Sequence, residues 1–406
     1  MSGATESVLP ATASGRRIAE VDVLRGFALF GILITNVTVA TMLWSAGGTE
    51  ADPTLRFDGT IDHVTGGLVE ALFEGRFYLL FAFLFGYSFT LQIAAAQRAG
   101  AAPNKRLLRR CAALMAIGLA HVFLLWVGDI LTLYAFLCLI LILLRKLRPR
   151  AAVITGAVLY AAWSVWAFLP GSDDVISGVA EVFDLPAIHE GFTGNSADTF
   201  ATQVSLAPGF LLLIWFTQGI TSLGLFLIGM AAGERGVLED RNTLRRWAPR
   251  ALWLGLGVGL PISAVSFAGS MNWYQVPSFW GGVQELVNPL MTFAYIAGIV
   301  LLAQSARSAR VIGWLAPAGR MAASNYIAQS VVLMVVYTGY GFALVDTIPP
   351  AGVIGIALLT YAAQLTVSSW WLRTHSYGPV EWLLRAATYL SIPSWRRSDT
   401  RSASSR

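Results

Sequence analysis

Long apolar runs separated by short polar segments organise this chain. An α-helix needs about twenty apolar residues to cross the hydrocarbon core of a bilayer, and ten runs approach that length. They cover residues 22–44, 76–97, 107–127, 129–146, 150–170, 208–232, 250–270, 284–305, 313–341 and 352–373. The ninth run is longer than a bilayer requires, and we expect it to tilt or break near Gly339. The pattern predicts an all-α, polytopic membrane protein with about ten transmembrane helices.

The segments between the runs include two long outer loops, residues 45–75 and 171–207. The first loop ends in a stretch whose apolar positions follow helical spacing. The second contains six acidic residues and neither Lys nor Arg. Loops of this length serve as lids or binding elements, or rest as solvated loops on the membrane surface. Both interpretations stay open at this point.

The two ends of the chain flank a transmembrane domain of residues 21–374. Residues 1–20 and 396–406 are rich in small polar residues and predict disordered cytoplasmic tails. Residues 375–395 contain a Gly-Pro pair followed by a short Trp/Leu-rich stretch. Such a stretch is typical of an amphipathic helix that lies in the membrane interface, here on the cytoplasmic leaflet.

The basic residues support this count and give it an orientation. With a cytoplasmic N-terminus, 28 Lys and Arg residues are distributed so that all except Arg56 and Arg76 fall in cytoplasmic segments. Acidic residues gather instead in the outer segments. Lys and Arg concentrate on the cytoplasmic side of membrane proteins, so we predict that both termini are cytoplasmic. The pI near 9.4 therefore follows from topology and does not indicate nucleic-acid binding.

Composition agrees with a multi-pass protein of the cell membrane, either inner or plasma membrane. The chain is 56% hydrophobic and 13% charged, with a mean hydropathy of +0.62, whereas about a quarter of the residues of a soluble protein are charged. Cys111 and Cys138 fall in or beside apolar helices, so we expect no disulfide framework. The bilayer is the expected partner, and a homodimer is a candidate assembly that the sequence does not decide.

The best candidate chemistry lies where the third run gives way to the fourth. Gly128 permits a tight turn, and Asp129 can cap the returning helix. His121 lies seven residues before Gly128, about 10 Å below the turn. An ionisable group at that depth is costly and indicates a functional site. Asp129 would orient the imidazole as a base if a re-entrant turn or water brings the two together; otherwise both are structural. Four histidines without ligand spacing predict no metal site.

Polar residues within the other runs predict a polar cavity. Asp22 and Arg25 form either an anchoring ion pair or a cytoplasmic mouth that binds an anionic ligand. Arg76 either snorkels to the interface or pairs with Asp129. The further predicted cavity-lining residues are Asn36, Tyr134, Gln218, Glu285, Asn288, Asn325 and Gln329. Taken singly, each is explained as a hydrogen-bonding contact between helices.

Several motifs appear in order over about residues 22–390. They read DVLRGFALFGIL with Asn36, FAFLFG at 81–86, GLAH at 118–121 with GDIL at 128–131 and Tyr134, GRM at 319–321 with NY at 325–326 and Gln329, and GPVEW at 378–382. In this combination the chain resembles the YeiB-like membrane proteins.

That resemblance implies a distant similarity to transmembrane acyltransferases such as heparan-α-glucosaminide N-acetyltransferase, which also begin with an Asp-x-x-Arg-Gly helix. Those enzymes take an acyl group from cytosolic acyl-CoA and deliver it to an acceptor on the far side, with a central histidine. The resemblance implies that His121 is that histidine. The position of the histidine in the heparan enzyme favours His63, in the first outer loop, as the alternative.

The leading hypothesis is therefore a membrane acyltransferase that uses acyl-CoA or acetyl-CoA as donor substrate. The arginines expected to attract the CoA phosphates are Arg25, Arg320, Arg106, Arg109 and Arg110. His121, oriented by Asp129, would deprotonate an outer acceptor, which is a small molecule or a lipid. The alternative is a small-molecule transporter or exporter, in which the polar stripes line the substrate path.

Overall fold

The computed structural model describes residues 19–45, 57, 59–168, 183–277, 279–305 and 308–397. Within these ranges every named element is a helix. Seven helical segments there are long and apolar enough to cross a membrane, and two shorter apolar helices, Leu131–Leu144 and Ala322–Tyr337, accompany them. These observations confirm an all-α, polytopic membrane protein.

Each predicted span corresponds to helical structure. These elements are α1 (Ala19–Trp44), α3 (Phe77–Arg98), α4 (Pro103–Leu124), α5 (Leu131–Leu144), α6 (Pro149–Trp166), α9 (Ser196–Glu234), α10 (Arg241–Leu254) continued by the π-helical Gly255–Gly259 and α11 (Leu260–Ser270), α12 (Trp280–Gln304), α15 (Ala322–Tyr337) and α16 (Pro350–Thr374). Shorter elements are α2 (Thr60–Leu72), α8 (Leu185–Thr193), α13 (Ala309–Gly313), α14 (Leu315–Arg320) and α17 (Pro379–Tyr389).

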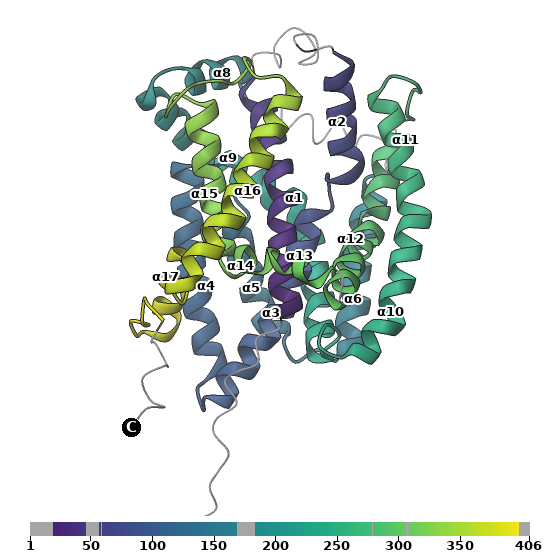
Figure 1. The fold of residues 1–406 in the computed structure, drawn as a ribbon, viewed down its shortest axis with the longest axis vertical. Coiled ribbons are helices and arrows are strands. Elements are labelled where there is room, and N and C mark those ends of the chain that lie inside the picture. Colours follow the sequence, from purple (N-terminus) through teal and green to yellow (C-terminus); the bar gives the residue numbers. More distant parts are fainter. Residues whose placement is uncertain are drawn as a thin grey trace, which may run out of the picture.

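The helices form a bundle with two distinct ends (Figure 1). Helix α1 passes through the middle of the view. Helices α2 and α8 lie at one end, which we call the acidic end after the acidic outer segments that contain them. The start of α1 and helix α17 lie toward the other, which we call the basic end. The alternation of spans between the two ends agrees with the topology predicted from the basic residues.

The outer segments are more helical than the sequence indicated. The amphipathic stretch of the first loop forms α2, as predicted. The second segment contains α8, and α9 then begins at Ser196 instead of near residue 208. A reciprocal cap starts α9 early: the side chain of Asn195 accepts the N–H of Ala197, and Asp198 accepts the N–H of Asn195. Residues 171–182 of this segment lie outside the described residues.

The ninth span is broken at a point that the sequence did not indicate. Helix α15 ends at Tyr337, close to the expected break near Gly339. A second interruption at Met321 separates α14 from α15. Glu381 of α17 supplies the partners that the restarting helix needs, since it accepts the N–H groups of Ala323 (2.7 Å) and Ser324 (3.2 Å). Exposed N–H groups inside a membrane are costly, so this long-range cap permits the break.

Helices α1 and α14 cross in backbone contact because glycines face each other there. A Cβ added at Gly319 would overlap the carbonyl oxygen of Asp22, and one at Gly26 would overlap that of Leu315. This close approach, possible only without side chains at both positions, brings the segments that carry Arg25 and Arg320 together.

We expect Gly319→Ala to lower the stability of the folded protein by about 1–3 kcal/mol, because the added methyl forces α1 and α14 apart. Thermal unfolding in detergent measures this as a lower Tm. Gly355→Ala is the matched control, since Gly355 lies within α16 with open space around its Cβ position. Equal Tm values for the two variants would contradict the described contact.

Labelling can test the orientation. Ser196 is exposed at the start of α9, whereas Cys111 and Cys138 are buried. A Ser196→Cys variant should react with a membrane-impermeant thiol reagent added outside intact cells, because the positive-inside rule places this segment outside. The parent protein, which keeps its two buried cysteines, is the control. Labelling that requires opened membranes would reverse the assigned orientation.

Candidate functional site

A histidine, an aspartate and a serine from three separate segments form a hydrogen-bonded chain in the interior. The Nδ1 of His121, in the last turn of α4, lies 2.8 Å from Oδ1 of Asp129. The Nε2 of His121 lies 2.8 Å from the Oγ of Ser330 on α15. An ionised carboxylate only accepts, so Nδ1 carries the proton and Nε2 accepts the Ser330 hydroxyl hydrogen. Each of the three residues is 2% exposed.

Asp129 reaches the imidazole because the chain folds back between α4 and α5. Helix α4 ends at Leu124, and the second oxygen of Asp129 accepts the N–H of Thr132 at 2.7 Å in the first turn of α5. A Cβ at Gly118 would crowd Thr132 and this carboxylate, so a glycine there lets α5 begin against α4. Asp129 therefore caps α5 and orients His121 at the same time, which joins the two alternatives that the sequence left open.

Ser330 is the member of this chain that the sequence did not indicate. It lies 209 positions after His121, directly after Gln329 in α15. A serine in such a helix normally donates to the carbonyl four residues earlier, and Ser330 does lie 3.5 Å from that of Tyr326. Only its contact with His121 in the folded protein distinguishes Ser330 from an ordinary helical serine.

A cationic cavity of about 390 Å³, which we call cavity 1, lies toward the basic end. Four arginines and one glutamate line it: Arg25, Arg110, Arg320, Arg385 and Glu381. The remaining lining is largely apolar and aromatic, with Phe81, Leu84, Phe85, Leu114 and Leu384 among its members. Cavity 1 thus combines a concentration of positive charge with an apolar surface.

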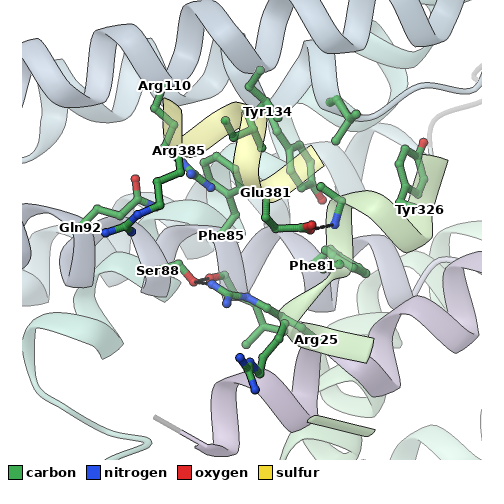
Figure 2. Close-up of a pocket in the computed structure, with 18 of the residues that line it drawn as sticks. Arg25, Phe81, Phe85, Ser88, Gln92, Arg110, Tyr134, Tyr326, Glu381 and Arg385 are labelled. Atoms are coloured by element: carbon green, nitrogen blue, oxygen red, sulfur yellow. Dashed lines mark hydrogen bonds between the residues drawn. The ribbon is translucent and has the colours of Figure 1, made fainter. Parts of the chain in front are cut away.

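The lining of cavity 1 is held by specific contacts (Figure 2). The Nη2 of Arg25 donates to Ser88 of α3 at 2.5 Å, and its Nη1 lies 3.4 Å from Asp22. Gln92 and Tyr326 lie at opposite ends of the drawn pocket. The Nε of Arg110 is buried without a hydrogen-bond partner among the described residues. Arginine donors arranged in this way bind phosphate or carboxylate groups strongly.

Helix α17 forms one wall of cavity 1. The guanidinium of Arg385 lies over the rings of Tyr377 (5.0 Å to the centroid) and Tyr389 (4.6 Å). The guanidinium of Arg106, from α4, also lies over the Tyr389 ring, at 4.9 Å. Burial raises the pKa of Glu381, while the hydrogen bonds from Ser324 and from the start of α15 act in the opposite direction. The interfacial helix predicted from the sequence is therefore part of the site.

A second cavity of about 470 Å³, cavity 2, lies toward the acidic end. Among the described residues, its charged lining consists of three glutamates, Glu70, Glu74 and Glu285, without Lys, Arg or His. Four amides also line it: Asn36, Gln218, Gln284 and Asn288. Four of the residues predicted to line a cavity from the sequence thus gather here: Asn36, Gln218, Glu285 and Asn288.

Two polar atoms around cavity 2 have no partner among the described residues. They are the buried Nε1 of Trp126 and the Oε1 of Gln218, and both residues line the cavity. A buried indole N–H without an acceptor is costly, so a bound molecule with an acceptor oxygen would relieve that cost. The two atoms therefore mark cavity 2 as a place that suits a polar ligand.

A thin wall that contains the His121–Asp129 pair separates the two cavities. Ile130 lines both cavities, and its neighbours Gly128 and Leu131 line cavity 2 and cavity 1 respectively. Tyr326 lines cavity 1, its ring centroid lies 5.1 Å from that of His121, and its hydroxyl lies 3.5 Å from the Gly128 carbonyl oxygen. Asp129 therefore sits between residues that face opposite cavities.

Arg76 does not pair with Asp129, which corrects the salt bridge suggested from the sequence. Its guanidinium donates to Ser263 at 2.9 Å and to the carbonyl oxygens of Glu70 and Ala71 at the end of α2. Arg76 is buried and lines neither cavity. It joins α2 to α11 and thereby supports the acidic end of the bundle.

Most of the other predicted residues line neither cavity. Asn325 bonds to Ser368, and Gln329 bonds to Gln364, so both join α15 to α16. Asp22, Asn325, Gln329, Arg106, Arg109 and His63 line neither cavity 1 nor cavity 2. Tyr134 lines cavity 1, and its hydroxyl donates to the carbonyl of Tyr78, a residue that lines cavity 2.

Comparison with known proteins identifies the family. Residues 232–391 match the family model described as "Protein of unknown function (DUF418)". No solved structure matches this chain. The protein YxaH of Bacillus subtilis (strain 168), described as uncharacterized, is 31% identical over 95% of this chain and 97% of its own length.

A second relative, YeiB of Escherichia coli (strain K12), is 25% identical over 92% of this chain and 96% of its own length, and is also described as uncharacterized. None of these descriptions names an activity. The near full-length match to the Bacillus protein shows the family: the chain belongs to the YeiB-like (DUF418) membrane proteins.

Proposed function

We propose that this protein is an acyltransferase of the cell membrane that moves an acyl group from cytosolic acyl-CoA to an acceptor at the outer face. The observation that carries this proposal is the buried His121–Asp129 pair in the wall between an arginine-lined cavity and a glutamate-lined cavity. A positioned imidazole in such a wall is suited to move a proton between two different substrates.

Cavity 1 suits the donor. Four arginines attract the phosphates of CoA, and the apolar and aromatic lining suits the pantetheine arm and the acyl chain. The cavity extends inward to Tyr326, which contacts the ring of His121. A donor held by its phosphates at the basic end would therefore place its thioester toward the imidazole.

Cavity 2 suits an acceptor that is not anionic. Its glutamates can accept hydrogen bonds from hydroxyl or amino groups, and its described lining has none of the arginines that would bind a phosphate or carboxylate. The rings of Phe73, Phe77 and Tyr78 add flat apolar surface, and the amides add donors and acceptors. A small polyhydroxylated or amino compound fits this lining, and so does the polar part of a lipid.

A transporter is the second candidate, because two cavities that face opposite ends with a wall between them also describe an occluded transport path. The charge contrast argues against it. An anionic solute bound by the four arginines of cavity 1 would find no arginine among the described lining residues of cavity 2. Two different substrates, one for each cavity, account for the contrast directly.

The arginines of cavity 1 should control donor affinity. We expect Arg110→Ala and Arg385→Ala each to raise the Kd for CoA about tenfold, since a charge-assisted hydrogen bond contributes about 1.5–3 kcal/mol. The loss should shrink at high salt. Calorimetry on protein in nanodiscs measures the Kd.

Arg109→Ala is the matched control, because Arg109 is the exposed neighbour of Arg110 and lines neither cavity. An equal effect of all three substitutions would indicate general surface attraction instead of a donor site. If the parent protein binds no CoA, the transporter becomes the better account.

His121 should be required for chemistry but not for donor binding. We expect His121→Gln to lower acyl transfer by about 10²–10⁴-fold, because glutamine cannot take up a proton, while the Kd for CoA stays close to that of the parent. Release of free CoA thiol from acetyl-, octanoyl- and palmitoyl-CoA gives the rate. Asp129→Asn should lose less, since it disturbs orientation and leaves the base in place. Retained transfer in His121→Gln, together with its loss in His63→Gln, would move the catalyst to α2.

A further inference from the structure

We propose that Ser330 is the nucleophile that carries the acyl group, so that transfer proceeds through an acyl-serine intermediate. This inference rests on the proposed acyltransferase function and adds to it the residue that becomes covalently modified. It follows from the partner of the second imidazole nitrogen, which is a serine of this chain.

The hydrogen bonds direct the Ser330 proton toward the imidazole. The hydroxyl lies 2.8 Å from Nε2 of His121 and 3.5 Å from the carbonyl of Tyr326, so the shorter bond to His121 is the better one. Asp129 holds the opposite nitrogen and fixes the tautomer that accepts this proton. Nucleophile, base and orienting carboxylate are therefore in the order that activates a serine.

Capping of α5 uses one oxygen of Asp129 and does not account for the imidazole that lies at the other. The same helix α15 makes its contacts with α16 through neutral groups, with Gln329 bonded to Gln364 at 2.9 Å and Asn325 bonded to Ser368 at 2.9 Å. A buried carboxylate has a much larger desolvation cost than an amide. The use of Asp129 next to His121 is explained if the imidazole must become transiently positive, because the carboxylate stabilises that charge.

The position of Ser330 suits a carrier between the two cavities. Ser330 follows Tyr326 by one helical turn, so both lie on one face of α15. Tyr326 lines cavity 1, and its ring lies against His121. Ser330 does not line cavity 1, so the proposed reaction requires this ring to move aside. Burial of Ser330 keeps water away from the ester once it forms.

The first half-reaction transfers the acyl group to the protein. The Oγ of Ser330 attacks the thioester carbonyl carbon while its proton moves to Nε2 of His121. The tetrahedral intermediate then collapses, the carbon–sulfur bond breaks, and the leaving sulfur takes the proton from His121. The products are free CoA thiol and an acyl ester on Ser330, and Asp129 stays ionised throughout.

The second half-reaction releases the acyl group toward the acidic end. A hydroxyl or amino group of the acceptor, entering from cavity 2, attacks the ester carbonyl and gives its proton to His121. The bond from the carbonyl carbon to Oγ breaks, and Oγ takes the proton back. CoA and the acceptor never need to occupy one cavity, which agrees with the different linings of the two.

Trapping of the intermediate tests this inference. The purified full-length protein in nanodiscs is incubated without acceptor with acetyl-, octanoyl- or palmitoyl-CoA, each labelled in its acyl group, and then denatured in acid. We expect covalent label on the peptide that contains Ser330, found by mass spectrometry. Ser330→Ala should lower the label by about a hundredfold or more, since the nucleophile is gone.

Two variants separate chemistry from misfolding. Ser330→Cys keeps a nucleophile, so its label should persist as a thioester that neutral hydroxylamine removes, unlike the serine ester. Ser164→Ala is the matched control, because Ser164 is a buried helical serine whose hydroxyl bonds to the Tyr160 carbonyl, away from the triad. It should label like the parent.

The possible outcomes distinguish failure of the acyl-serine intermediate from failure of the proposed acyltransferase activity. Release of CoA that is equal in the parent and in Ser330→Ala, without label on Ser330, would overturn the acyl-serine and leave an acyltransferase with direct transfer. Failure of the parent to bind or cleave any of the three thioesters would overturn the proposed function itself. Label on the Ser330 peptide that Ser330→Ala removes and Ser164→Ala keeps supports the acyl-serine.

Discussion

Hydrocarbon offers no hydrogen-bond partners, so each polar group inside this protein depends on another one, and the Asp129 carboxylate is the most demanding of them. One oxygen holds His121 and the other holds the first turn of α5. These two bonds fix where α4 ends, where α5 begins and how the imidazole points. Gly118 makes the arrangement possible by leaving room for the carboxylate. The geometry of the wall between the cavities follows from this buried carboxylate.

Apolar run lengths determine most of this fold, which is why the spans could be predicted from the sequence. The His121–Asp129 pair was also within reach, since a turn signal next to a buried ionisable group is a local pattern. Ser330 was not, because only tertiary packing brings a serine of α15 to a histidine of α4. The break at Met321 was hidden for the same reason: its cap, Glu381, comes from a different helix. For Arg76 the sequence suggested an ion pair with Asp129 that does not form. Its guanidinium instead donates to backbone carbonyl oxygens at the end of α2.

The charge separation between the cavities follows from the way membrane topology distributes ionisable residues. Arginines concentrate at the basic end as a requirement of insertion, and some of them face inward and line cavity 1. Glutamates remain at the acidic end and line cavity 2. Arg25 and Asn36 of α1 lie in the two different cavities, and eleven residues of helix place them about 16 Å apart. One helix therefore reaches both compartments, with the wall between them.

Helix α17 completes cavity 1 and is made late in synthesis. Its residues form a wall of cavity 1, and its Glu381 satisfies the start of α15. A ribosome makes this helix after every other named element of the structure. A growing chain therefore has no complete cavity 1 while the helices before α17 enter the membrane, and cavity 1 is complete only when α17 docks. Any binding by cavity 1 must therefore wait until α17 has been made and has docked.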